Sequence, residues 1–411
     1  MLGLEARPQP SRLMSLASPV IALAATVVVA ALLFIALGKD PARGLGVFFL
    51  EPLSSVRAFS EVLLKATPLI LCALGLAVCY RSNVWNIGAE GQFLLGAIAG
   101  GGVSLWLTMH GYGGPRGLYS PIVLIAGVLG GMGWAALVAL LRDRFNANEI
   151  LVSLMLVYVA AQLLNYLVFN AWKDPQGFNF PQTKTFVAST WLPSLLPPSR
   201  LHWGFVVALV LVGVFWAFLS GSWKGYQLQV GGLAPAAARY AGFSSRSALW
   251  TALLISGGMA GLAGAMEVAG PLRQLTPHVS TGYGFTAIIV CFVGRLHPLG
   301  IVLSGMLLSM MLIGGELSQS RLGLPNALTG VFQGLLLFLL LACDTLIHYR
   351  IRWRSAPTTA AAVPSGAADA SPPALPPTPL SPLSPTPSSL SSSSQPSPSS
   401  PSPTIPPMTS A

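Results

Sequence analysis

The sequence contains very little charge. Only 8% of its 411 residues are charged and 53% are hydrophobic, whereas roughly a quarter of a soluble domain is charged. Most charged residues stand between long apolar runs, because a charge is costly to bury in hydrocarbon. We therefore expect an integral membrane protein. The bases are dispersed over short loops and form no dense stripe, which favours membrane lipid as a partner and argues against nucleic acid.

The residue patterns of metal sites and common catalytic centres are also missing. The four cysteines lie in or at the ends of apolar segments, without CxxC spacing or a nearby histidine. The sequence has no GxxxxGKS or GxxxxGKT loop for nucleotide phosphates, no HExxH, and no Gly-x-Ser-x-Gly elbow with suitable partners. We expect a protein that is not an enzyme and binds neither cofactor nor metal. Energy for transport must then come from an ion gradient or another subunit.

Ten apolar stretches approach the roughly 20 residues that span a bilayer. The eighth is weak, because Arg295, His297 and Pro298 interrupt it, and it predicts a half-helix or a re-entrant turn. The first is longer than a signal-peptide core and lacks a small-residue cleavage site, so we expect a retained helix. The approximate bounds of the ten stretches are 18–38, 61–80, 91–109, 119–141, 150–169, 203–220, 248–270, 280–294, 298–315 and 325–347.

The bases of the loops predict the orientation. Ten spans place both termini on one side, and alternating loops then divide the bases into two sets. The richer set has tight clusters next to helix ends, where the positive-inside rule is strongest, so we expect both termini in the cytoplasm and the chain in the cell (inner) membrane. That set comprises Arg7, Arg12, Arg81, Arg142, Arg144, Lys224, Arg239, Arg246, Arg295, Arg350, Arg352 and Arg354.

The chain divides into three predicted regions. Residues 1–17 form a cytoplasmic segment and residues 18–354 a transmembrane domain. From Ser355 onward Pro, Ser, Thr and Ala dominate and Asp369 is the only charge. Such a composition cannot offset the entropy of ordering, so we expect residues 355–411 to be disordered. This tail is either a Pro-rich ligand for a partner or a dispensable extension.

A polar motif precedes the third apolar stretch. The segment RSNVWNIGAEGQFLLGA, Arg81 to Ala97, leads directly into a membrane helix. Irregular backbone and polar side chains at membrane depth are tolerated only where they line a cavity or are buried in protein. The motif therefore indicates a broken helix at a solute pathway, although a plain loop would have a similar composition. Four polar residues crowd into ten positions together with two glycines: Asn83, Asn86, Glu90 and Gln92, with Gly88 and Gly91.

A long loop between the sixth and seventh stretches predicts a short helix of its own. Pro235 suits a first turn, the alanines that follow are strong helix formers, and Gly242 supplies a stop. We expect a helix over 235–241. Its surface is almost uncharged apart from Arg239, so it is suited to a groove on another protein; a helix lying on lipid is the alternative.

Isolated ionisable residues near the span ends have plain interpretations. Glu61 and Lys65 are spaced i and i+4 with the acid first, which predicts an ion pair at the membrane rim. Glu267 and Glu316 stand near span ends, where they are expected to reach water. His297 between Leu296 and Pro298 is interpreted as a turn residue rather than a proton relay.

Several motifs, in order, resemble one family. They are RSNVWNIGAEGQFLLGA from Arg81, KATPLILCALGLAV from Lys65, FNANEILVSLMLVYVA from Phe145, GGLAPAAARYAGF from Gly231, AGLAGAMEVAG from Ala260 and GYGFTAIIVCFVGRLHPLG from Gly282. About residues 55 to 345 resemble the permease subunits of ABC importers of the branched-chain amino-acid and simple-sugar superfamily. The subgroup most similar works with basic-membrane-lipoprotein-type binding proteins and is associated with nucleoside uptake.

The resemblance implies an all-α type II importer fold that carries a small polar solute, a nucleoside or simple sugar. It implies three partners: a separate ABC ATPase that uses the ATP, a second permease, and a periplasmic or lipoprotein solute-binding protein. The residues it assigns to the translocation pathway are Asn86, Gly88, Glu90, Gly91 and Gln92. Those of the ATPase-coupling helix are Gly232, Pro235, Ala237, Ala238, Arg239, Tyr240, Ala241 and Gly242.

The chain departs from the family pattern at Ala234 and Val157, where relatives usually have Asn, and at Thr286, where they usually have Asp. The last two lie close to membrane segments. The competing interpretation is a secondary transporter or channel, which would couple through ionisable groups in the membrane.

Overall fold

A computed structural model describes residues 2–6, 12–325 and 327–353. The apolar runs form helices, because only a helix satisfies every backbone polar group within one segment in lipid. The main elements are β1 (Leu2–Ala6), α1 (Arg12–Ala36), α2 (Pro41–Leu45), α3 (Val56–Arg81), α4 (Ala89–Met109), α5 (Ser120–Phe145), α6 (Glu149–Tyr166), α7 (Gly204–Gly221), α8 (Trp223–Leu233), α9 (Pro235–Tyr240), α10 (Ser245–Glu267), α11 (Tyr283–Val293), α12 (Pro298–Leu322), α13 (Ala327–His348) and β2 (Tyr349–Trp353). Short 3-10 or π-helical turns occupy Gly46–Leu50, Glu51–Leu53, Leu167–Ala171, Ala188–Thr190 and Val268–Leu272.

The predicted spans are confirmed. In the described residues nine helices are long and apolar enough to cross a membrane. The eighth predicted stretch is α11, which has 11 residues and at about 1.5 Å per residue covers only half of a bilayer core of roughly 30 Å. It is the half-helix that the interrupted run predicts. The all-α prediction needs one addition, since β1 pairs antiparallel with β2.

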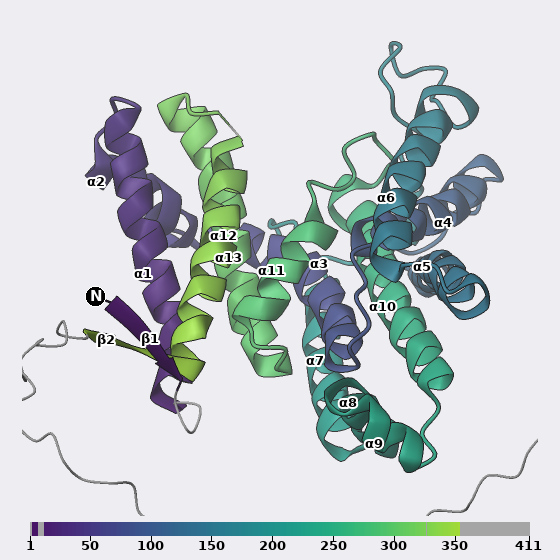
Figure 1. Cartoon of the computed structure of the whole chain (residues 1–411). Helices are drawn as coiled ribbons and strands as arrows, with labels where there is room; N and C mark the ends of the chain where they lie inside the picture. Colours follow the sequence, from purple (N-terminus) through teal and green to yellow (C-terminus); the bar gives the residue numbers. More distant parts are fainter. Residues whose placement is uncertain (1, 7–11, 326, 354–411) are drawn as a thin grey trace, which may run out of the picture. The chain divides into compact units, whose positions relative to one another are not determined.

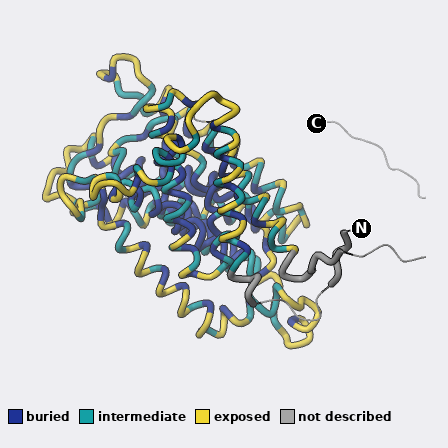
Figure 2. Tube along the Cα trace, turned by 90° about the vertical axis from the view of Figure 1, so that its left-hand side faces the viewer, coloured by how far each residue is buried: buried dark blue, intermediate teal, exposed yellow. Residues whose placement is uncertain are grey.

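Helices α3 and α10 form the interior of the bundle. Helix α10 packs against α3, α4 and α5, while α3 also contacts α7, α11 and α12. Helix α1 packs against α13 (Figure 1). Buried residues gather along the middle of the bundle and exposed residues lie at its ends and on its outer helices (Figure 2). Close approach of the inner helices depends on glycine: a Cβ at Gly96 would clash with the backbone of Gly261.

The ends of several helices meet on one face of the bundle, which we call the terminus face. The Arg81 Nε at the end of α3 donates to the Leu296 carbonyl oxygen over 3.1 Å. Arg295 pairs with Asp344 of α13 at 2.8 Å, and Ser18 of α1 donates to the same carboxylate at 2.6 Å. The start of α1 and the end of α13 therefore lie on one face, as an even number of crossings requires, so α11 and the segment before it complete the tenth crossing.

The loop between α11 and α12 confirms the interpretation of His297. Its backbone reverses through Arg295 and Leu296, which have φ of 54° and 56°, and exposed His297 is the N-cap of α12. The predicted disordered tail, 355–411, lies outside the described residues, as do residues 1 and 7–11 of the 1–17 segment. Helix α1 begins at Arg12, earlier than the predicted residue 18.

Candidate functional site

The polar motif after α3 turns back into the bundle. Its centre is Asn86, whose side-chain amide donates to the Gln92 side-chain oxygen and to Ser256 Oγ, both over 3.0 Å. Gln92 Nε2 donates back to Asn86 Oδ1 at 3.2 Å, and the Gly88 backbone donates to the same oxygen at 2.9 Å. Ser256 lies near the middle of α10. The chain between α3 and α4 therefore turns back into the bundle as a buried, non-helical segment, which agrees with the broken helix that the sequence predicts rather than with a plain loop.

Glu90 joins this re-entrant segment to the half-helix α11. Its carboxylate accepts a hydrogen bond of 2.6 Å from the backbone of Gly284, in the first turn of α11. A carboxylate at a helix N-terminus compensates both the unpaired N–H groups and the helix dipole. A Cβ at Gly284 would collide with the Glu90 backbone, so the close contact needs glycine there. Two interrupted elements thus meet at membrane depth.

The five predicted pathway residues are brought together. Asn86, Glu90 and Gln92 are all buried; Gly88 approaches Ser153 and Gly91 approaches the Val157 backbone. The side chains of Asn86 and Gln92 are satisfied by each other and by α10, so they fix the broken helix in place. Their role in moving a solute stays a prediction.

Helix α9 stands out from the terminus face. It covers Pro235–Tyr240, close to the predicted 235–241, and Gly242 ends it with φ of +77°. Ala238 alone in this helix is buried, while Tyr240 is 97% exposed. Ala234 is the N-cap and makes no side-chain cap bond, so Ala there omits the cap that the Asn of relatives could supply.

Helix α8 holds α9 in position. A Cβ at Gly232 would overlap the Arg81 carbonyl oxygen, so α8 lies directly on the end of α3. Trp223 and Tyr226 of α8 stack and both contact the Phe243 ring after α9. The predicted coupling residues therefore form one unit fixed to the terminus face.

A cleft of about 600 Å³ lies between α9 and the ends of α5 and α10. Two ion pairs stand in its wall, Arg246 with Asp143 at 2.7 Å and Arg142 with Glu149 at 3.3 Å. Arg246 joins the end of α5 to α10 and Glu149 joins it to α6.

The face opposite the terminus face carries ionic contacts that differ from the prediction. Glu61 does not pair with Lys65: it binds Arg200 through two bonds of 2.7 and 3.1 Å, and Lys65 lies 3.8 Å from Glu316. Glu267 does not reach water either, since it is buried and accepts a hydrogen bond from Tyr283 at 3.5 Å. These partners come from other helices, so spacing within one helix could not identify them.

Two titratable groups stand beside this cluster, outside the spans. His202 is buried against Gly270 and accepts a hydrogen bond from the Gly204 backbone at its Nδ1, and burial lowers the pKa of His202 to about 4. Hydrogen bonding to Glu61 raises the pKa of Arg200, so that guanidinium remains charged.

A ten-crossing helical bundle with two interrupted elements at membrane depth and an exposed short helix on one face has the architecture of a transport permease. Residues 58–341 match the family described as the branched-chain amino acid transport system / permease component. That match covers more than half of the chain, and the protein belongs to this family of ABC transporter permeases.

Named relatives are similar over most of their length. The glucose ABC transporter permease protein TsgB13 of Haloferax volcanii is 32% identical over 81% of this chain and 89% of its own. The guanosine ABC transporter permease protein NupP of Bacillus subtilis is 31% identical over 78% and 91%. Among solved structures, an inward-facing putative metal-chelate type ABC transporter has a TM-score of 0.43 at 16% identity, covering 79% of this chain and 98% of that one.

Proposed function

We propose that this chain imports a neutral, polar small molecule, a nucleoside or a simple sugar, across the cell (inner) membrane, with the terminus face in the cytoplasm. The bases that crowd next to helix ends on that face support the orientation. The solute class is supported by the relatives, which are named for glucose and guanosine. We also propose that a solute-binding protein delivers the solute and that a second permease completes the pathway.

Energy is supplied in this proposal by a separate ATPase, and this chain binds no cofactor itself. The observation that carries it is the surface of α9. Tyr240 is 97% exposed on α9, whose only charge is Arg239, and Leu233 at the end of the preceding helix α8 is 86% exposed. Large, solvent-exposed apolar side chains next to a face rich in bases indicate a binding site for a protein partner. ATP binding would then push α9 and bias the bundle between two states.

Replacing Arg239 and Tyr240 together with Ala tests this assignment. Neither side chain is buried or bonded within the described residues, so the bundle should fold normally. ATP-driven uptake of radiolabelled guanosine or glucose should fall to background, while the ATPase still hydrolyses ATP. The matched control replaces Arg144 and Phe145, an exposed base and aromatic at the end of α5 on the same face, and should transport normally.

Wild-type uptake in the Arg239/Tyr240 variant would contradict docking at α9. Uptake that an uncoupler abolishes while ATP remains intact would contradict the ATPase altogether and favour a secondary transporter.

A further inference from the structure

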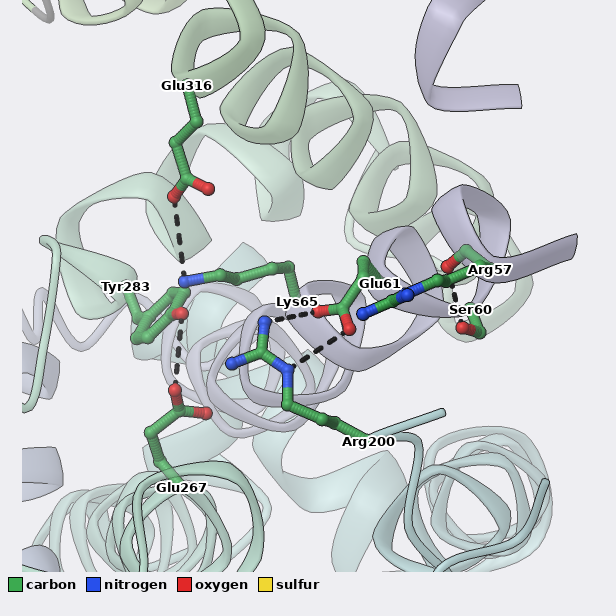
Figure 3. Close-up of polar contacts among 8 residues, drawn as sticks. All are labelled: Arg57, Ser60, Glu61, Lys65, Arg200, Glu267, Tyr283 and Glu316. Atoms are coloured by element: carbon green, nitrogen blue, oxygen red, sulfur yellow. Dashed lines mark hydrogen bonds and ion pairs between the residues drawn. The ribbon is translucent and has the colours of Figure 1, made fainter. Parts of the chain in front are cut away.

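Ionisable side chains from four helices converge on the face opposite the terminus face. Lys65 of α3 lies 3.8 Å from a carboxylate oxygen of Glu316 on α12. The same ammonium lies 5.4 Å from the ring centroid of Tyr283 on α11. The Tyr283 hydroxyl in turn donates to Glu267 on α10 over 3.5 Å. Figure 3 shows Lys65 between Glu316 and Tyr283, with Glu267 on the far side of the phenol.

The two outer groups of this row are partly exposed and the two inner groups are buried. The Glu316 side chain is 52% and that of Lys65 18% exposed, whereas Glu267 is 6% and Tyr283 only 1% exposed. The row therefore leads from the surface to a carboxylate inside the bundle. A buried carboxylate is retained only where something compensates its lost hydration.

Within the described residues, few hydrogen bonds replace the lost hydration of Lys65 and Glu267. An ammonium has three hydrogen-bond donors and a carboxylate about four acceptor positions. Lys65 has an ion pair too long for a hydrogen bond, and Glu267 accepts one bond at the outer limit of length. The adjacent Arg200 and Glu61, by contrast, are bound at 2.7 and 3.1 Å. Lys65 and Glu267 thus have hydrogen-bonding capacity left for a ligand.

We propose that Lys65, Glu267 and Tyr283 form a solute-binding subsite that recognises the vicinal hydroxyls of a neutral polyhydroxylated molecule as it enters. Two hydroxyls would donate to the Glu267 carboxylate, and the Lys65 ammonium would donate to a hydroxyl or ring oxygen. Because the two charges are opposite and close, the subsite suits a neutral solute better than an ion. This inference rests on the proposed function, whose nucleosides and sugars both carry such a diol.

The test uses proteoliposomes that contain the full-length permease, its ATPase and its binding protein. Uptake of radiolabelled guanosine and glucose is compared with that of 2′,3′-dideoxyguanosine and 2,3-dideoxyglucose, which lack the diol. The variants are Glu267→Gln and Lys65→Met. The control is Glu51→Gln, which removes the same charge from an ion pair with Arg321 outside the subsite.

The discriminating quantity is the ratio of diol to dideoxy uptake, because the binding protein contributes equally to it in every variant. Losing one charge-assisted bond should lower that ratio roughly tenfold in Glu267→Gln. Lys65→Met should lower it in the same direction, and Glu51→Gln should leave it within about twofold of wild type, since that pair is exposed.

An unchanged ratio in both subsite variants, or an equal loss of both solutes, would overturn the subsite and leave a structural role for the cluster. If Glu267→Gln yields no folded protein, Lys65→Met alone decides the matter by the same ratio. Wild-type protein that takes up neither guanosine nor glucose would instead refute the proposed function, and the subsite with it.

Discussion

The short helix on the terminus face and the polar cluster on the opposite face are constructed differently. Helix α9 is a local structure: proline begins it, alanines continue it and Gly242 ends it. The polar cluster consists of side chains from distant parts of the chain, such as Glu61 and Arg200, which are 139 residues apart. The α8–α9 unit therefore depends on backbone shape and the cluster on matched charges, and substitutions should affect these two regions in different ways.

The largest effect is expected where backbone meets backbone on the terminus face. A Cβ at Gly232 would overlap the Arg81 carbonyl oxygen, whereas one at the next-door Gly231 has no atom within 4 Å. Gly232→Val should introduce strain of about 3 kcal/mol and push α8 away from α3. Since each ~1.4 kcal/mol is a factor of ten in an equilibrium, uptake should fall roughly tenfold or more.

Gly231→Val is the matched control and should transport normally, as measured by ATP-driven uptake at equal membrane amounts. Equal loss in both variants would mean that helix propensity, and not the contact with α3, governs this face.

The contrast also explains what the sequence could predict. Helix α9, the half-helix α11 and the broken helix at Asn86 depend on local patterns of proline, glycine and apolar residues, and all three are present as expected. The multi-span helical membrane class followed from run length and charge alone, whereas the type II importer fold was implied by the resemblance. Tertiary partners did not follow, because Asn86 meets Ser256 across 170 residues and no local rule selects that residue.

Glu267 shows why depth was misjudged. The predicted stretch ends at 270, close to Glu267, but the buried Tyr283 of the separate helix α11 lies beside the carboxylate and donates a hydrogen bond to it. The carboxylate is consequently buried rather than wet. For Glu61 the predicted partner was wrong. A lysine at i+4 is a good partner within a helix, but Arg200 forms two parallel hydrogen bonds to the carboxylate, which a lysine cannot do.

A second effect, confined to the face opposite the terminus face, should appear on acidification. Burial lowers the pKa of His202 from 6.5 to about 4, so as the pH falls the unfolded chain binds the proton first. The stability that depends on the neutral ring is complete above pH 6.5 and should be lost between 6.5 and 4, by up to about 3 kcal/mol.

Thermal unfolding of the purified protein between pH 7.5 and 4.5 measures this loss. His202→Asn retains an acceptor for the Gly204 backbone but cannot be protonated, so its midpoint should fall less steeply with pH. His278→Asn, at an exposed site, should behave as wild type. Parallel curves for wild type and His202→Asn would assign the acid sensitivity to other groups.

The smallest effect should come from exchanging charges at the surface of the cluster. The Arg200 side chain is 60% exposed, and such pairs contribute only about 0.5–1 kcal/mol. Glu61→Arg and Arg200→Glu should each lower the uptake rate by roughly two- to fivefold, because each leaves like charges facing one another. The double exchange restores the opposite charges and should recover most of the rate.

Combining Glu61→Arg with Arg321→Glu should not recover the uptake rate, since Arg321 pairs with Glu51 instead. Rescue by that mismatched combination would show that net charge alone matters on this face, and the distinction between matched pairs here and backbone fit at α9 would fail.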